Sequence, residues 1–169
     1  MPDRFILYVI LAILMALLSA NVEAKDVPKA HVVAAILVAE AGGEANPGMQ
    51  AVLNVLNNRA RIKNSILFVY QAATKKWQFS AYNRVAVSKK WTDAQFVAYY
   101  SKHPKYEAAL HLIRYMVMKK LPDVTGGATH YFNPRHAKPS WAPPKYGGTN
   151  KKAIFTVKIG QHVFFRNVD

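Results

Sequence analysis

One glutamate, Glu40, lies where the helical pattern of residues 30–59 predicts a buried side chain. The apolar residues Val33 and Leu37 recur at the spacing of one buried helix face, and Glu40 follows Val33 by seven positions, within about 20° of it. Burial disfavours the charged form of a carboxyl group, so its pKa rises and it can hold a proton near neutral pH, as a general acid must. The alternatives are a buried glutamate paired with Lys or Arg, and a glutamate that faces solvent at the helix end.

The residues after Glu40 predict a sharp turn and a second helix. Gly42 and Gly43 predict the end of the first helix, since glycine takes the left-handed C-terminal conformation without steric cost. Asn46 and Pro47 resemble a cap followed by a first-turn proline. The expected second helix, residues 47–60, can pack on the first as a helical hairpin, with Glu40 near its mouth. Its apolar face consists of Met49, Val52, Leu53, Leu56 and Ala60.

The stretch AEAGGEANPGMQAVLNVLNNR, residues 39–59, resembles the signature of the SleB-type cell wall hydrolases, the family of the spore cortex-lytic enzymes. That signature is Glu-Ala-x-Gly-Glu, a short gap, Gly-x-x-Ala-Val and an Asn-Arg pair. Later pieces agree in order: WQFSAYN from residue 77, GGATHYFNP from 126, SW at 140 and IGQHVFF from 159. The resemblance covers residues 30–165. It implies an α+β, mainly helical, lysozyme-like or lytic-transglycosylase-like small domain with a minor β-hairpin, and it makes Glu40 the catalytic acid.

The resemblance also implies a substrate cleft. In the family the Gln-Phe-Ser piece, here Gln78, Phe79 and Ser80, lines this cleft. The amide of Gln78 can donate and accept hydrogen bonds with the acetamido and hydroxyl groups of amino sugars, and Trp77 or Phe79 can stack on a sugar ring. The alternative for Phe79 is a ring that plugs the core. Further cleft candidates are Glu44, His130, Tyr131, Asn133, Trp141 and His162.

The rest of the chain reads as helices followed by aromatic loops and a hairpin. Helices are expected at residues 65–73, 92–101 and 104–120, with a loop at 74–90, and strands at 153–159 and 162–166. Residues 123–148 are rich in Gly, Pro and aromatic side chains. Loops of this composition are expected to cover a core, and their aromatic side chains can bind carbohydrate. The spacing of His130, His136 and His162 fits no compact ligand motif, so neither a metal nor a cofactor is predicted.

Composition and the N-terminus bound the class of protein. The chain has 169 residues and no cysteine, and a single domain that is a monomer is expected. Its net charge of +14 predicts a preference for polyanions. Residues 1–24 combine Arg4 with an apolar run at 5–20 and small residues before Lys25, which predicts an export signal to the periplasm or cell wall. The run spans about 24 Å as a helix, less than the roughly 30 Å of a hydrocarbon core, so a cleaved signal is favoured over a permanent anchor. A retained signal-anchor, as in some phage lysis enzymes, stays open, and export disfavours nucleic acid as a partner.

The catalytic domain, residues 25–169, is expected to cleave the β-1,4 bond between N-acetylmuramic acid and N-acetylglucosamine in peptidoglycan. Ordinary glycosidases use two carboxyl groups. Only Glu44 is near Glu40 in sequence, and Gly42-Gly43 interrupts the helix between them, which favours a single acid. The family resemblance then implies a lytic transglycosylase, in which the 6-hydroxyl of muramic acid attacks. A muramidase with the same Glu40, a phage endolysin role and a non-catalytic basic wall-binding domain are the alternatives.

Overall fold

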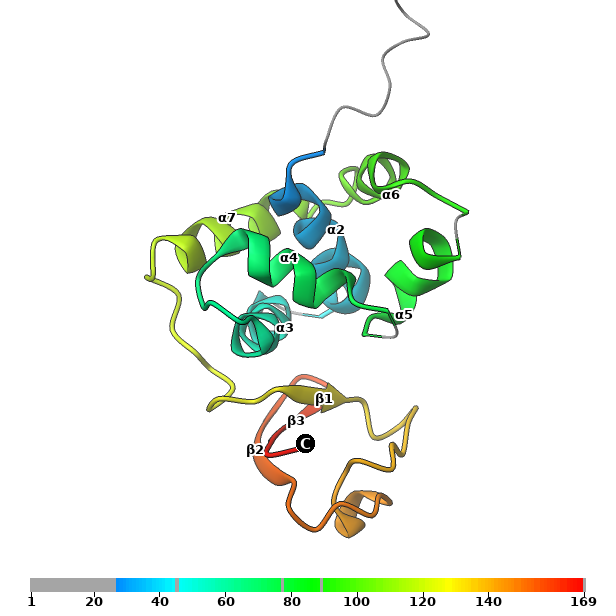
Figure 1. Ribbon diagram of the computed structural model, residues 1–169, viewed down its shortest axis with the longest axis vertical. Helices are drawn as coiled ribbons and strands as arrows, with labels where there is room; N and C mark the ends of the chain where they lie inside the picture. The colour runs from blue at the N-terminus through cyan, green and yellow to red at the C-terminus, as the bar shows by residue number, and fades with distance from the viewer. Residues whose placement is uncertain (1–26, 45, 77, 89, 169) are drawn as a thin grey trace, which may run out of the picture.

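The computed structural model describes residues 27–44, 46–76, 78–88 and 90–168 (Figure 1). The predicted export signal at residues 1–24 and the stacking candidate Trp77 lie outside the described residues. Within these ranges the chain is mainly helical, with a small antiparallel sheet below the helices, as the sequence predicted. None of the described helices is long and apolar enough to cross a membrane.

Helix α2, Lys29–Ala41, is the centre of the helical layer. Residues 32–38 are all at most 4% exposed, so the helix is buried on every side and not along the single face that its pattern predicted. The reason is that other helices surround it: α3 (Asn46–Arg59), α4 (Ile66–Thr74), α6 (Asp93–Tyr100) and α7 (Tyr106–Val117). Gly42 caps α2 with φ −63° and not with the predicted left-handed conformation, because its N–H still donates to the Val38 carbonyl.

Helix α3 connects the helical layer to the sheet. Its predicted apolar face, which includes Val52 and Leu56, is buried with α2 in the main core. A second side, with Ala51 and Val55, packs against Phe164 of the sheet. The sequence pattern did not predict this second contact, because small apolar residues such as alanine and valine do not indicate whether they pack on another helix or on a sheet.

The remaining helices occur where they were predicted, with different bounds. α6 begins with a capping box between Thr92 and Gln95, and α7 ends at Val117, three residues before the predicted end. The early end follows from the backbone of Lys119, which has φ +57°. The predicted loop at 74–90 also contains α5 (Ser80–Tyr82) and a π-helical turn (Asn83–Val87).

The sheet has the order β1-β3-β2 and is antiparallel throughout. β2 (Ile154–Ile159) and β3 (His162–Arg166) form the predicted hairpin. β1 (His130–Phe132) was not predicted, because three residues are too few to show an alternating pattern. Its pairing places Tyr131 opposite Phe164.

The loops after β1 build a small core of their own, whereas the sequence predicted that they would only cover one. The residues Phe132, Ala142, Ala153, Val163, Phe165 and Val168 are buried together, with the rings of Trp141 and Tyr146 packed against them. Aromatic contacts hold this cluster, including stacked rings of Phe132 and Phe165 with centroids 5.7 Å apart. The sheet is therefore supported from both faces.

Two asparagines of α3 hold the segment that leads from α7 to β1. The Asn54 side chain is 3% exposed and accepts a hydrogen bond from the Val124 N–H at 3.1 Å. Asn58 donates to the Ala128 carbonyl and to the Asp123 carboxylate, both at 3.0 Å. Partial burial raises the pKa of Asp123, but hydrogen bonds from the Thr125 hydroxyl, Asn58 and backbone N–H groups outweigh it, so the net pKa is lowered. These bonds fix where the sheet meets α3.

We predict that Asn54→Ala lowers the free energy of unfolding by about 1–3 kcal/mol, because the Val124 N–H loses its partner and the buried Asn54 side chain leaves an unfilled space. Urea denaturation monitored by circular dichroism measures this change. The control is Gln71→Ala on the exposed side of α4, expected within about 0.5 kcal/mol of the wild type. Equal stability of the two variants would contradict the role of Asn54.

Candidate active site

Glu40 occupies the last turn of α2, where that helix leaves the core. Burial raises the pKa of its carboxyl group, and interactions with the backbone of Ala81, the Tyr131 hydroxyl and the backbone of Ser80 act in the opposite direction without cancelling it. The oxygen Oε1 is buried and has no hydrogen-bond partner of normal geometry among the described residues. A carboxyl group in this environment is stabilised in its protonated form, which is the form a general acid needs.

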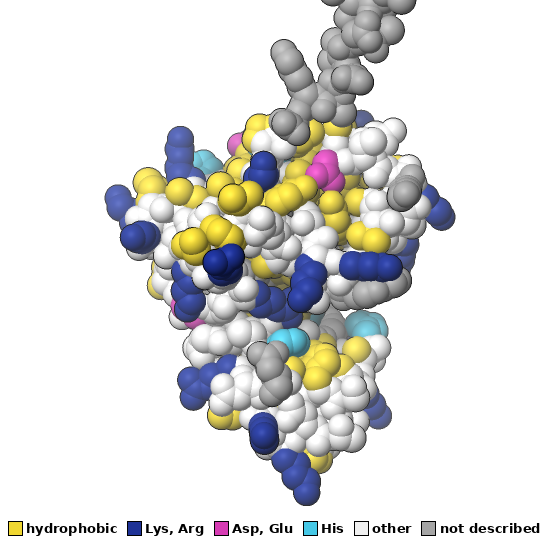
Figure 2. All heavy atoms as spheres, in the orientation of Figure 1, with side chains coloured by type: hydrophobic (Ala, Val, Ile, Leu, Met, Phe, Trp, Pro, Cys, Tyr) yellow, Lys and Arg dark blue, Asp and Glu magenta, His cyan; other side chains and the backbone are white. Residues whose placement is uncertain are grey.

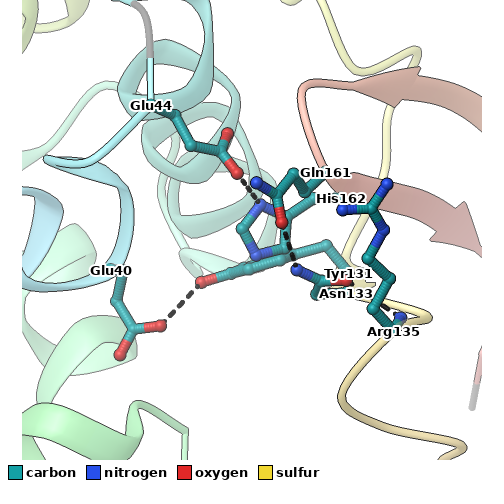
Figure 3. Close-up of polar contacts among 7 residues, drawn as sticks. All are labelled: Glu40, Glu44, Tyr131, Asn133, Arg135, Gln161 and His162. Carbon is teal, nitrogen blue, oxygen red and sulfur yellow. Dashed lines mark hydrogen bonds and ion pairs between the residues drawn. The ribbon is translucent and has the colours of Figure 1, made fainter.

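Tyr131, in the middle of β1, is the residue that the sheet presents to Glu40. Its hydroxyl lies 3.3 Å from Glu40 Oε2 and donates a hydrogen bond to it (Figure 3). The ring stacks on Phe164 with centroids 5.5 Å apart, which fixes its direction. Burial and the charge of Glu40 raise the pKa of Tyr131 well above 10, so the hydroxyl keeps its proton. Tyr131 was predicted as a cleft residue, and the structure brings it to the predicted acid.

The second carboxylate, Glu44, is held on the other side of Tyr131 (Figure 3). Its Oε1 lies 2.8 Å from His162 Nδ1, and the His162 ring packs edge-on against Tyr131 at 5.1 Å. A Cβ atom added at Gly48 or Gly160 would lie 2.5 or 2.6 Å from Glu44 Oε2, so only glycine leaves room for the carboxylate there. Oε2 itself is buried without a hydrogen-bond partner in the described part of the chain.

Gln78 is directed toward a residue that was not predicted to belong to the site. Arg59, at the end of α3, donates from Nη1 to Gln78 Oε1 at 2.6 Å and from Nε to the Thr129 carbonyl. The feature of the sequence that could have indicated Arg59 as a site residue is the Asn-Arg pair that ends the motif at residues 39–59. Ser80 is exposed beside Gln78. Phe79, in contrast, is 2% exposed and belongs to the main core, so its ring is not available to a sugar.

The other predicted cleft residues divide between the two faces of the sheet. The His130 ring packs against the Trp141 ring, with centroids 5.0 Å apart, and Trp141 also packs on Phe132 of the small core. Because successive strand residues point to opposite faces, His130 is directed away from the side on which Tyr131 meets Glu40. Asn133 donates to Gln161 at 3.1 Å, next to His162. The structure thus brings together Glu40, Tyr131, Glu44 and His162, and it leaves His130 and Trp141 at the flank.

Two recesses adjoin each other at Gln78; one lies at the boundary between the helices and the sheet, and the other is lined by Ser80, whose backbone interacts with Glu40. One, of about 360 Å³, is lined by residues that include Arg59, Lys75, Gln78 and His130. Another, of about 480 Å³, is lined by Gln78, Ser80, Asn83 and Arg84. Figure 2 shows Lys and Arg side chains gathered along the same boundary on the face in view. Across the ranges that the structure describes, no group of three or more His, Asp or Glu side chains could hold a metal ion.

Comparison with known proteins gives one match. The family model described as "Cell Wall Hydrolase" matches residues 43–165, which is more than half of the chain and includes Glu44, Gln78, Tyr131 and His162. The match begins three residues after Glu40. No curated protein and no solved structure matches the chain. The family predicted from the motifs is confirmed.

We predict that Tyr131→Phe raises the pKa of the Glu40 carboxyl group further, because the lost hydrogen bond stabilises the charged form. A ¹³C NMR titration of glutamate carboxyl groups measures it, with Glu40 assigned by the signal that disappears in Glu40→Gln. Tyr146→Phe is the control, since Tyr146 packs in the small core. An unchanged or lower Glu40 midpoint in Tyr131→Phe would show that the hydroxyl does not act on this carboxyl group.

Proposed function

Because this chain belongs to the cell wall hydrolase family, we propose that it cleaves the β-1,4 bond between N-acetylmuramic acid and N-acetylglucosamine in peptidoglycan, with Glu40 as the acid. The observation that carries the proposal is the Glu40 carboxyl group, whose pKa burial raises and which interacts with the backbone of Ser80, a residue that lines one of the recesses. Peptidoglycan lies outside the cell membrane, so export directed by residues 1–24 is part of the proposal. Recovery of the chain only from the cytoplasm would contradict that part.

In the first step, protonated Glu40 donates its proton to the oxygen that links the two sugars, and the bond from that oxygen to the muramic acid C1 breaks. Tyr131 donates to Glu40 Oε2, and Oε1 accepts no hydrogen bond of normal geometry from the described residues, so we assign the proton to Oε1, which must turn out of its buried position to reach the substrate. Because Tyr131 keeps its own proton, it continues to donate after Glu40 becomes a carboxylate. It therefore stabilises the charged product of the proton transfer.

The environment of Glu44 supports a lytic transglycosylase over a hydrolase. A second catalytic carboxylate must reach water or the sugar C1. One oxygen of Glu44 is engaged by His162, and the other is enclosed between Gly48 and Gly160. With Glu44 held in this way, the nucleophile available at C1 is the 6-hydroxyl of the muramic acid. Its oxygen bonds to C1, its proton passes to the Glu40 carboxylate, and a 1,6-anhydro sugar forms without consuming water.

A muramidase is the second candidate, and the Glu44–His162 pair is the observation that favours it. The pair lies beside Tyr131, and a substrate that displaced His162 from Glu44 would leave a carboxylate able to activate water. The two enzymes differ in their product, which makes them separable by experiment. A phage lysis role is compatible with both and concerns only where the enzyme is delivered.

We predict that Glu40→Gln folds normally and loses about 10²–10⁴-fold in turnover of purified peptidoglycan sacculi, because the amide cannot donate an acidic proton. Loss of sacculus turbidity measures the rate. The control is Glu107→Gln on the exposed side of α7, which makes the same substitution at a residue that lines neither recess and should retain the wild-type rate. If Glu40→Gln kept more than about a tenth of the rate, Glu40 would not be the acid.

A second prediction concerns the product. Digestion in ¹⁸O-labelled water followed by mass spectrometry is expected to give 1,6-anhydro muropeptides, lighter than hydrolysis products by one water and without label. Reducing muramic acid ends that carry ¹⁸O as the main product would establish the muramidase instead. In that case Glu44→Gln should abolish the incorporation of label, since Glu44 would be the base that activates water.

A further inference from the structure

We propose that the recess lined by Arg59, Lys75, Gln78 and His130 binds a carboxylate of the peptide stem attached to muramic acid, so that the enzyme recognises the peptide as well as the glycan. This proposal rests on the proposed function, because it assumes that the glycan bond is cleaved at Glu40. It adds a specific site for an acidic group, which we call the stem recess. Its other lining residues are Asn58, Ala72 and Thr129.

The chemistry of the stem recess suits an anion. Its lining contains an arginine, a lysine and a histidine, and no Asp or Glu is among the described lining residues. Gln78 and Thr129 add groups that can donate hydrogen bonds. A volume of about 360 Å³ is at the small end of ligand pockets, which is enough for part of a short peptide and not for a whole disaccharide-peptide.

Arg59 is oriented before any ligand arrives. Its Nε donates to the Thr129 carbonyl and its Nη1 to Gln78 Oε1, so the plane of the guanidinium is fixed between the sheet and the loop after α4. A fixed guanidinium loses less side-chain freedom when it receives a carboxylate. The same two bonds make Arg59 part of the junction between the layers, so substitution of Arg59 would test folding and binding at once.

Lys75 is the residue that tests binding separately. It directly follows α4, is exposed, and in the described part of the chain its ammonium group has no ion-pair partner. A lysine on a surface with no partner is common. Here, however, it lines the same recess as Arg59 and His130. A carboxylate in this recess would meet the positive charge of both Lys75 and Arg59.

The stem recess is connected to the proposed acid through two residues. Gln78 lines the stem recess and also the adjoining recess with Ser80, and the backbone of Ser80 acts on the Glu40 carboxyl group. His130, which also lines the stem recess, points to the face of the sheet opposite Tyr131, so Gln78 and Ser80 make the connection. A muramic acid with its C1 at Glu40 therefore has the stem recess within reach of its substituents. The substituent that peptidoglycan carries on this sugar is a short peptide with free carboxylates, covalently linked through a lactyl group.

The experiment compares native sacculi with sacculi whose free carboxyl groups have been converted to amides by carbodiimide and ammonium chloride. Both substrates keep the glycan and the stems, and sacculi without phosphate polymers exclude phosphate as the anion. At 0.15 M salt, where the Debye length is about 8 Å, long-range attraction is largely screened. We expect the wild type to turn over native sacculi about fivefold faster than amidated sacculi, and Lys75→Glu to lose that preference.

The matched control is Lys102→Glu, which makes the same charge change at an exposed position between α6 and α7. It should keep the wild-type preference, and Lys75→Gln should weaken the preference without reversing the charge. The stem recess is refuted if the wild type has no preference, if Lys75→Glu keeps it, or if Lys102→Glu loses it equally. A wild type that cleaves neither substrate would instead refute the proposed function, and this inference with it.

Discussion

The hydrogen bond between Tyr131 and Glu40 is the contact that ties the sheet to the proposed acid. It joins the last turn of the central helix to β1 of the sheet. The carboxyl group at this point has a pKa that burial raises, so its protonated form is favoured. A buried carboxyl oxygen without a partner is unfavourable. The sheet supplies one donor, the Tyr131 hydroxyl, whose direction is fixed by stacking on Phe164, and the backbone of Ala81 and Ser80 also acts on the carboxyl group.

Glu44 shows a second constraint, which is steric. The turn between β2 and β3 approaches α3 so closely that Gly160 and Gly48 both lie against the Glu44 carboxylate. Gly160 also has φ +57°, so two independent requirements select glycine at the turn. The contact between Glu44 and His162 then fixes the turn relative to Tyr131. The hairpin is thus part of the site, although the sequence alone presents it as a terminal pair of strands.

The sequence predicted features that depend on local periodicity or on a motif. The helices, the hairpin of β2 and β3, the family and the burial of Glu40 were all predicted. It did not predict β1, the small core around Phe132 or the contact between Arg59 and Gln78. β1 is too short to show an alternating pattern. The small core and the contact between Arg59 and Gln78 join residues that are distant in sequence. For the same reason Phe79 was placed in the cleft: the Gln-Phe-Ser motif does not say which of its side chains faces the core.

The partners of the carboxylates account for the basic surface. Glu40 accepts from Tyr131 and Glu44 pairs with His162. Asp93 accepts hydrogen bonds from two tyrosine hydroxyls and Asp123 from Asn58 and Thr125. The chain has 23 Lys and Arg residues against 9 acidic ones, so these contacts leave the cations largely on the surface, as Figure 2 shows for one face. The positive charge of these side chains is available for an anionic polymer, and Arg59 and Lys75 bring part of it to the stem recess at the boundary between the layers.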